Sequence, residues 1–308
     1  MIRQQIITAA DGTSLYYEVS GTQNTSRRIA VLCDGIGCDG FIWRYLKPWL
    51  ERRCQVLHPH YRGHGCSGRS ITQQGYRIDM LAEDIETVLE YEQFDEVVLI
   101  GHSMGVQVAL EAAASWPSER ILGLILMCGS FGRPLDTFRD VSAGSKWLPL
   151  FRMIVERYGL RLAPLIQRLT SSRLGWWVAL ATEVDGTRLS RDEFAPYLEH
   201  LAAMDPSVFL EMLTSTSLHT VEDRLVDIDI PALVVGGEFD RFTPYWVSQV
   251  MAQRLPSAEL LCLKGGTHAA PLEQPQRLEA ALSLFCEQHA FWSEGQGAPL
   301  ATENSNFA

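Results

Sequence analysis

The sequence contains no long hydrophobic run. Its most apolar stretch, residues 121–128, is far shorter than the about 18 consecutive apolar residues that a membrane-spanning helix needs. The first residues, MIRQQIITAADG, also lack the apolar segment of a secretory signal peptide. We therefore expect an unexported, cytoplasmic protein without a membrane span.

Basic residues are in deficit, and paired cysteines are missing. The 26 Lys and Arg residues against 37 Asp and Glu residues give a net charge of −11, which repels nucleic acid phosphates and anionic membranes. Nucleic acid is therefore not an expected partner. The seven cysteines are odd in number and none forms a CxxC pair, which favours reduced core thiols. His58 and His64 show no metal-ligand spacing, so no metal site is predicted.

Short runs of β type alternate with helical patterns, which is typical of a mainly parallel sheet with crossover helices. The length of 308 residues suits one large domain or a domain with an insertion. The predicted strands are residues 5–8, 15–19, 29–33, 54–58, 96–100, 121–128, 232–235 and 259–263.

A long segment without strand patterns separates the sixth and seventh predicted strands. From about residue 133 to 227 apolar residues recur at helical spacing, as in Trp147, Phe151 and Ile154, which predicts a helical cap. After the last strand, residues 274–289 predict a closing amphipathic helix. The tail, residues 291–308, is rich in small and polar residues and has little to bury, so we expect it to be mobile.

The most specific motif is G-H-S-M-G at residues 101–105, directly after a predicted strand and before a helical run. Glycine at both ends suits a tight strand-to-helix turn, because a Cβ atom on either side would clash. Ser103 would present its hydroxyl at the sheet edge, and the Met104 N–H at the helix N-terminus would face an oxyanion. The alternative is a glycine-rich turn with an incidental serine.

With this motif in this setting, the chain resembles the α/β-hydrolase family over about residues 10–289. In that family the nucleophile, the acid and the histidine follow one another along the chain. The resemblance implies that Asp240, in GGEFDRFTP, is the acid and that His268, in GGTH, is the base. Glu238 and Asp136 are competing acids, which we rank below Asp240.

The chemistry of ester cleavage explains why each of these residue types is needed. A serine hydroxyl is a poor nucleophile at neutral pH, so a neutral His268 must accept its proton and return it to the leaving group. Asp240 would hold the imidazole tautomer. The resemblance implies a second oxyanion donor, the Ile36 N–H, in the loop CDGIG after the third strand. Neither a metal nor an organic cofactor is expected.

Two positions depart from the family pattern. The family usually has His where this chain has Asp34, and Asp where this chain has His60. Because the third and fourth strands are neighbours in this fold, we expect Asp34 and His60 to form an acid–imidazole pair that supports the oxyanion loop. Two unrelated substitutions are the alternative.

The combined expectation is an α/β-hydrolase fold, with a mainly parallel eight-stranded sheet, helices on both faces and an inserted helical cap. The core would be residues 1–132 and 226–290, and the cap residues 133–225. We expect hydrolysis of a carboxylic ester through an acyl-enzyme on Ser103. Serine at position 103, in the strand-to-helix turn, argues against the haloalkane dehalogenase and epoxide hydrolase branches of the family, which place Asp at this position.

Other functions of the same fold stay open. Lactones, acyl thioesters and C–C bonds of vinylogous diketones suit the same triad, and a perhydrolase or haloperoxidase-like side activity is also compatible with it. An alternative of another class is a non-catalytic ligand receptor or binding module.

The cap suggests what the substrate is like. Its aromatic residues favour an apolar acyl or alcohol group, unless they only join cap to core. These residues are Trp147, Trp176, Trp177, Phe194, Tyr197 and Phe209. Residues 133–173 carry eight basic and three acidic side chains, a net charge of +5 that leaves −16 for the rest of the chain. This half of the cap either pairs with neighbouring acids and solvent, or attracts an anionic substrate or an acidic carrier protein.

Overall fold

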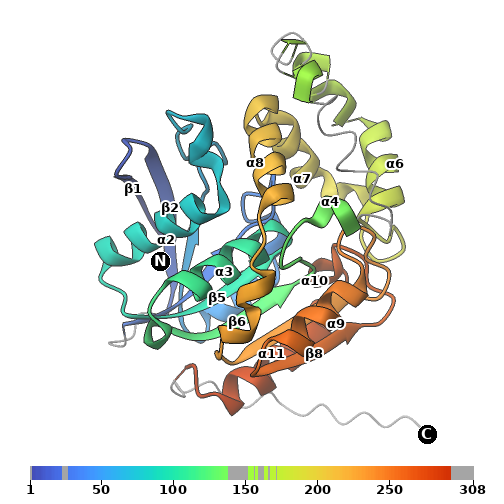
Figure 1. Ribbon diagram of the computed structural model, residues 1–308. Helices are drawn as coiled ribbons and strands as arrows, with labels where there is room; N and C mark the ends of the chain where they lie inside the picture. The colour runs from blue at the N-terminus through green and yellow to red at the C-terminus, as the bar shows by residue number, and fades with distance from the viewer. Residues whose placement is uncertain are drawn as a thin grey trace, which may run out of the picture.

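The computed structural model describes residues 2–22, 27–137, 152–155, 157–158, 163–165, 167–170 and 172–292. An eight-stranded sheet with the order β1-β2-β4-β3-β5-β6-β7-β8 forms the centre of the molecule (Figure 1). Its strands are β1 (Arg3–Thr8), β2 (Ser14–Gly21), β3 (Arg28–Cys33), β4 (Gln55–Pro59), β5 (Glu96–His102), β6 (Ile121–Met127), β7 (Ala232–Gly237) and β8 (Ala258–Leu263). All eight predicted strands are confirmed.

The directions of the strands bring four loops to one edge of the sheet. β1 and β2 form an antiparallel edge, and β2 pairs antiparallel with β4. From β4 to β8, neighbouring strands run parallel, and β3 lies between β4 and β5 as expected. The carboxyl ends of parallel strands meet at one edge, where α/β sheets place their ligand sites. The segments after β3, β5, β7 and β8 therefore share this edge.

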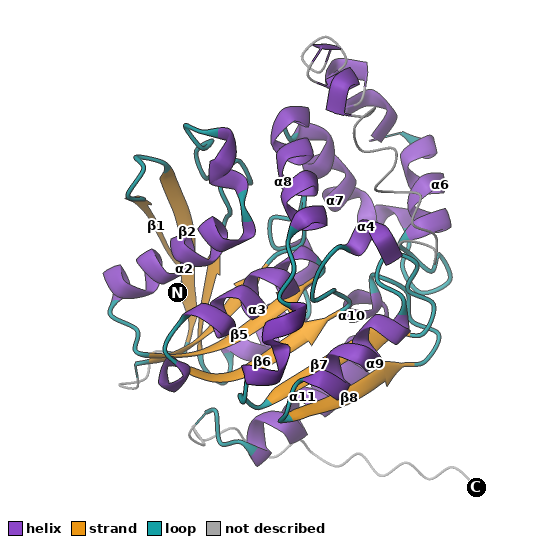
Figure 2. Ribbon diagram, in the orientation of Figure 1, coloured by secondary structure: helices purple, strands orange, loops and turns teal. Residues whose placement is uncertain are grey.

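Helices cover both faces of the sheet (Figure 2). In β3, alternate residues enter two separate apolar clusters, one packed against α2 and α3 and the other against α1 and α11. This two-sided burial explains why β3 is a continuous apolar run rather than an alternating one. The named helices of the described residues are α1 (Leu46–Glu51), α2 (Ile78–Glu92), α3 (Met104–Ser115), α4 (Pro134–Thr137), α6 (Arg173–Thr182), α7 (Arg191–Ala203), α8 (Pro206–Leu218), α9 (Tyr245–Arg254), α10 (Ala270–Glu273) and α11 (Pro275–Gln288), with 3-10 helices η1 (Phe41–Trp43), η2 (Gln73–Tyr76), η3 (Ser118–Arg120) and η5 (Glu222–Asp227).

The segment between β6 and β7 contains helices and no strand among its described residues. In Figure 1, α6, α7 and α8 stand above the carboxyl edge of the sheet. α7 begins with a capping box, in which Ser190 and Glu193 each accept a hydrogen bond from the other's backbone. An isolated bridge between Gly132 and Thr220 joins the two ends of this segment. These observations support a cap, although its bounds of 133 and 225 stay a prediction.

Parts of two predictions lie outside the described residues. Trp147 and Phe151 of the predicted helical pattern are among them, whereas Ile154 lies in a described helical turn. Residues 293–308 of the predicted tail are also outside, but Phe291 is described and is buried against Phe285.

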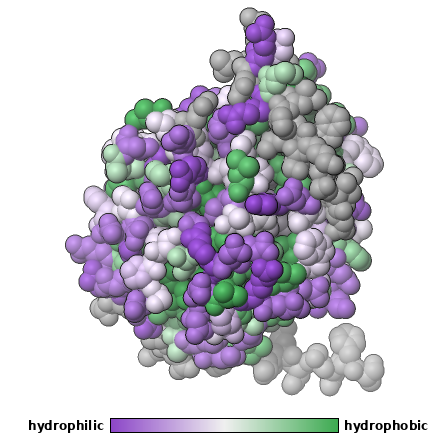
Figure 3. Space-filling model, in the orientation of Figure 1, coloured by the Kyte–Doolittle hydropathy of each residue, from purple (hydrophilic) through white to green (hydrophobic). Residues whose placement is uncertain are grey.

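The surface, the cysteines and the helix lengths bear on the kind of protein this is. The face shown in Figure 3 is mostly hydrophilic, with apolar residues in small separate groups. All seven cysteines are free thiols. Among the helices that the structure describes, none is both long enough and apolar enough to cross a membrane.

Candidate active site

Ser103 occupies a sharp turn between β5 and α3. Its backbone has φ 56° and ψ −118°, a conformation that non-glycine residues rarely adopt. A Cβ atom on Gly101 would lie 2.5 Å from the carbonyl oxygen of Gly105, and one on Gly105 would lie 1.9 Å from that of Cys33. Both glycines are therefore required by close backbone contacts, as the motif predicts.

His268 links Ser103 to Asp240. Its Nε2 lies 3.0 Å from the Ser103 Oγ, and its Nδ1 lies 2.9 Å from the Asp240 Oδ2. Because a carboxylate only accepts hydrogen bonds, Nδ1 carries the proton and Nε2 is free to accept the serine proton. The structure thus brings together the three residues selected from sequence, in an arrangement that can activate a hydroxyl nucleophile.

Asp240 is fixed by its own loop. Its Oδ1 accepts hydrogen bonds from the N–H groups of Phe242 (2.8 Å) and Thr243 (2.9 Å), and its Oδ2 accepts one from the Thr243 hydroxyl at 2.8 Å. Sequence reasoning did not single out Thr243, although a hydroxyl residue three positions after an aspartate is a typical turn signal. The rival Glu238 is exposed and accepts a hydrogen bond from the Gly265 N–H instead.

The environment of His268 favours its protonated form. Burial lowers the pKa of His268, but the charge and hydrogen bond of Asp240, with the charges of Glu183 and Glu273, raise this pKa above its usual 6.5 overall. Glu273 also accepts hydrogen bonds from the Thr267 N–H and hydroxyl, which holds the His268 loop. In the sequence, the position of Glu273 after the last predicted strand did not indicate this role.

We expect the raised pKa of His268 to set the acid side of the pH profile. Only the neutral imidazole accepts the serine proton, so kcat/KM for a neutral ester should fall as the pH falls through a midpoint above 6.5. Glu183→Gln removes one charge that raises this pKa, so its midpoint should be lower than that of the wild type. Initial rates between pH 5 and 9 provide the measurement, and an unmoved midpoint would contradict the assignment.

The loop after β3 places an amide beside Ser103. A Cβ atom on Gly35 would lie 3.2 Å from the Ser103 Cβ, so the two backbones approach closely. The Ile36 N–H has no hydrogen-bond partner among the described residues, and Met104 begins α3, where N–H groups lack partners within the helix. These are the two donors expected for an oxyanion.

Buried histidines hold the surrounding loops. The Gly37 N–H donates to the His64 Nε2 at 3.0 Å, next to Ile36. Burial lowers the pKa of His64 to about 4, so the ring stays neutral and can accept this bond. His102 donates from its Nε2 to the carbonyl oxygen of His268 at 3.0 Å. Both rings therefore have positioning roles.

The predicted Asp34–His60 pair is wrong. Asp34 Oδ2 instead lies 2.8 Å from the Nε2 of His58, and its Oδ1 accepts a hydrogen bond from the Trp43 Nε1 at 2.5 Å. His60 follows the end of β4, where its backbone N–H donates to the Tyr16 carbonyl and its ring packs on Tyr16. The His60 Nδ1 accepts a hydrogen bond from the Cys66 N–H, so the His60 ring holds the turn that follows β4 and does not contact Asp34 through a hydrogen bond.

The observed pair predicts energetic coupling between Asp34 and His58. Groups in one buried hydrogen-bond network usually couple by about 0.5–3 kcal/mol, so the stability loss of Asp34→Asn/His58→Asn should be smaller than the sum of the two single losses. Denaturant unfolding of the four proteins measures this. His289→Asn, outside this cluster, gives a matched cycle with Asp34→Asn that should be additive; coupling as large as that of His58 would contradict the pairing.

An apolar cavity lies over Ser103 and His268. Its walls come from the β3 loop, α3, α4, α7 and α8, with Glu183 directly after the end of α6. Of the predicted cap aromatics, Phe194, Tyr197 and Phe209 line it, Trp176 packs on Phe194, and Trp177 is exposed. Trp147 lies outside the described residues. No Lys or Arg lines the cavity within the described part of the chain.

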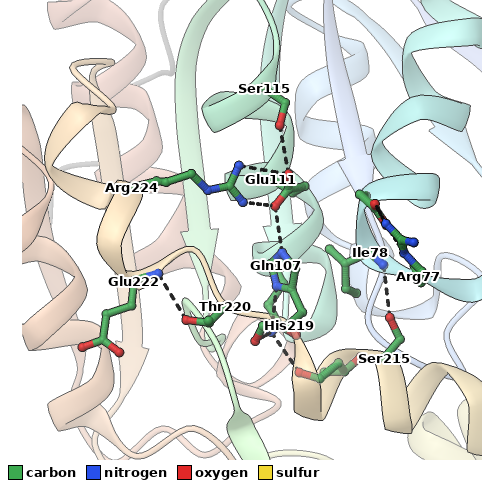
Figure 4. Close-up of polar contacts among 12 residues, drawn as sticks. Arg77, Ile78, Gln107, Glu111, Ser115, Ser215, His219, Thr220, Glu222 and Arg224 are labelled. Atoms are coloured by element: carbon green, nitrogen blue, oxygen red, sulfur yellow. Dashed lines mark hydrogen bonds and ion pairs between the residues drawn. The ribbon is translucent and has the colours of Figure 1, made fainter.

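A polar network behind the cavity joins α3 to the segment between α8 and β7 (Figure 4). Gln107, which lines the cavity, donates from its Nε2 to the Thr216 carbonyl at 3.1 Å. Glu111, one turn later, accepts hydrogen bonds from His219 at 2.9 Å and from both terminal nitrogens of Arg224. Burial raises the pKa of Glu111, but these hydrogen bonds lower it to about 2 overall. The network fixes the segment between α8 and β7 against α3, the helix that follows Ser103.

No group of three metal-binding side chains is found within the described ranges.

The chain matches a protein family model, related sequences and solved structures. A family model described as alpha/beta hydrolase fold matches residues 31–275. The magnesium-chelatase 30 kDa subunit of Rhodobacter capsulatus is 28% identical over 239 residues, which are 77% of this chain and 80% of that protein. RutD of Caulobacter vibrioides, whose name provisionally assigns carbamate hydrolysis, is 25% identical over 93% of this chain and 99% of its own. An esterase structure from Exiguobacterium antarcticum has a TM-score of 0.73 at 18% identity, covering 92% of this chain and 100% of its own, and shows a shared fold.

Proposed function

Because the chain belongs to the α/β-hydrolase family, we propose that it is a serine hydrolase that cleaves a carboxylic ester through an acyl-enzyme on Ser103. The observation that carries this proposal is the hydrogen-bonded series from Ser103 through His268 to Asp240, which opens into an apolar cavity. A receptor would need the cavity but not a histidine aligned between a serine and a buried carboxylate.

In the proposed first step, the Ser103 Oγ attacks the ester carbonyl carbon while the His268 Nε2 takes the hydroxyl proton. The carbonyl oxygen becomes an oxyanion and accepts hydrogen bonds from the amides of Ile36 and Met104. Asp240 stabilises the imidazolium that forms. When the tetrahedral intermediate collapses, His268 gives its proton to the leaving alcohol oxygen.

In the second step, water replaces the alcohol. His268 takes one proton from the water, the resulting hydroxide attacks the acyl carbon, and the proton returns to the Ser103 Oγ. The products are one carboxylic acid and one alcohol. A lactone, thioester or carbamate carbonyl could enter the same sequence, so these substrates belong in the same assay panel.

The cavity supports a substrate with an apolar acyl or alcohol group. An acidic carrier protein stays a prediction, and Arg139, Lys146 and Arg161 of the basic segment lie outside the described residues. Arg152 of the same segment pairs with Glu211 at 3.1 Å. A cytoplasmic location is part of the proposal and is supported by the seven free thiols.

A fluorophosphonate probe tests the nucleophile directly. We expect labelling of the wild-type protein at Ser103, found by peptide mapping, and no labelling of Ser103→Ala. A panel of p-nitrophenyl esters from acetate to long chain, with lactones, thioesters and carbamates, then identifies the bond that is cleaved. Absence of labelling at Ser103 in the folded protein would contradict the proposal.

A further inference from the structure

Glu183 places a carboxylate in the cavity beside His268. It follows α6 and lines the cavity, and no hydrogen bond or ion pair engages its carboxylate within the described residues. Its backbone is nevertheless fixed: the Glu183 carbonyl accepts hydrogen bonds from the Thr267 hydroxyl at 2.5 Å and from the Ala269 N–H at 3.1 Å. These two residues flank His268, so Glu183 lies next to the base.

A carboxylate in such a place is costly unless a partner is present. Charged groups taken from water into an apolar environment are normally paired or hydrogen-bonded. Burial raises the pKa of Glu183, while the charge of His268 acts in the opposite direction. Glu183 is half-buried, and its backbone rather than its side chain makes the contacts with the His268 loop, so its carboxylate has no protein partner among the described residues and can meet a ligand in the cavity.

The groups around Glu183 define what that ligand carries. Phe41, Phe194 and Tyr197 form one aromatic cluster that lines the cavity, with ring centroids 5.0–6.2 Å apart. Burial and the charge of Glu183 both raise the pKa of Tyr197, so its hydroxyl stays protonated. A carboxylate beside aromatic faces is a suitable site for an organic cation. An anionic ligand group would find no Lys or Arg among the described lining residues.

The position of Glu183 also indicates which half of the ester carries the cation. His268 must protonate the leaving oxygen, so the alcohol half lies on the side of His268. Glu183 is bonded to that same loop, whereas Gln107 and Thr216 line the cavity on the side of α3 and α8. The alcohol half is therefore the one within reach of the carboxylate.

We propose that Glu183 binds a protonated amine in the alcohol half of the substrate, so that the substrate class is esters of amino alcohols. This inference rests on the proposed ester hydrolysis, and it adds a specificity-determining residue to it. The ammonium N–H donates to the Glu183 carboxylate, and its alkyl groups pack on Phe194 and Tyr197.

Two esters of the same shape test this proposal. In 2-(dimethylamino)ethyl butyrate a protonated nitrogen occupies the position that a CH group occupies in 3-methylbutyl butyrate. The wild type should prefer the amine, and Glu183→Gln should reduce the ratio of the two kcat/KM values about tenfold or more, since hydrogen bonds to charged groups are among the strongest in proteins. Taking the ratio within each protein cancels any change that Glu183→Gln makes to His268.

Asp192→Asn is the matched control. Asp192 is exposed on α7 in the same segment and does not line the cavity, so this variant removes an equal charge and should keep the wild-type ratio. Equal ratios in the wild type and Glu183→Gln would overturn the amine site. An equal fall in Asp192→Asn would also overturn it, because the preference would then come from net charge.

A binding measurement separates this proposal from the proposed hydrolysis. Wild-type protein should gain more thermal stability from 2-(dimethylamino)ethanol than from 3-methylbutanol, and Glu183→Gln should lose that difference. If neither ester is cleaved but the difference in stabilisation is present, ester hydrolysis fails and the amine site stands. If both esters are cleaved at Ser103 without either difference, hydrolysis stands and the amine site fails.

Discussion

Ser103→Ala is expected to lower kcat/KM for the best ester by about 10⁴-fold or more. The variant keeps the two amides that we propose as oxyanion donors, the cavity and His268, but it has no atom that can form the proposed acyl-enzyme. Alanine meets the same backbone conformation at φ 56° as serine does, so folding should be unaffected. Single-turnover and steady-state rates, with the thermal midpoint of each protein, measure the two effects separately.

Ser115→Ala provides the matched control for that loss. Ser115 lies at the other end of α3, where its hydroxyl donates to Glu111 at 2.9 Å (Figure 4). It does not line the cavity, so its removal should leave kcat/KM within a factor of about two. More than a trace of ester hydrolysis by Ser103→Ala would mean that the nucleophile is another residue.

The sheet and the three aligned residues could be predicted from sequence because local patterns carry them. β3 and β5 are buried on both faces, so they appear as unbroken apolar runs of strand length. The turn at Ser103 needs glycines that backbone contacts impose, and those glycines mark its place. Asp240 follows such a strand, β7, and His268 follows the partly exposed edge strand β8, so strand order brings both to the edge where Ser103 lies.

Side-chain partners beyond the strand ends could not be predicted in the same way. His58 and His60 lie two residues apart, and only the turn after β4 decides which ring meets Asp34. Glu183 has no motif around it, and its place depends on how the segment after β6 packs on the His268 loop. Such contacts arise from tertiary packing, which no periodicity in the sequence records.

Asp240→Asn is expected to lower kcat by about 10⁴-fold, although it changes no shape. The asparagine oxygen can keep the N–H bonds of Phe242 and Thr243, which turns its amide nitrogen toward His268. His268 Nδ1 must then accept a hydrogen bond instead of donating one, and its proton moves to Nε2. A protonated Nε2 in a neutral ring cannot accept the proton of Ser103.

The two rival acids turn this prediction into a discriminating test. Glu238 accepts a hydrogen bond from the Gly265 N–H, and Asp136 in α4 makes no hydrogen bond with His268 within the described residues. Glu238→Gln and Asp136→Asn should therefore each change kcat by less than about tenfold. Steady-state rates of the three variants on one neutral ester are sufficient for the comparison. If Asp136→Asn were the most damaging, the acid would lie after β6, and the bond between Asp240 and His268 would have only a structural role.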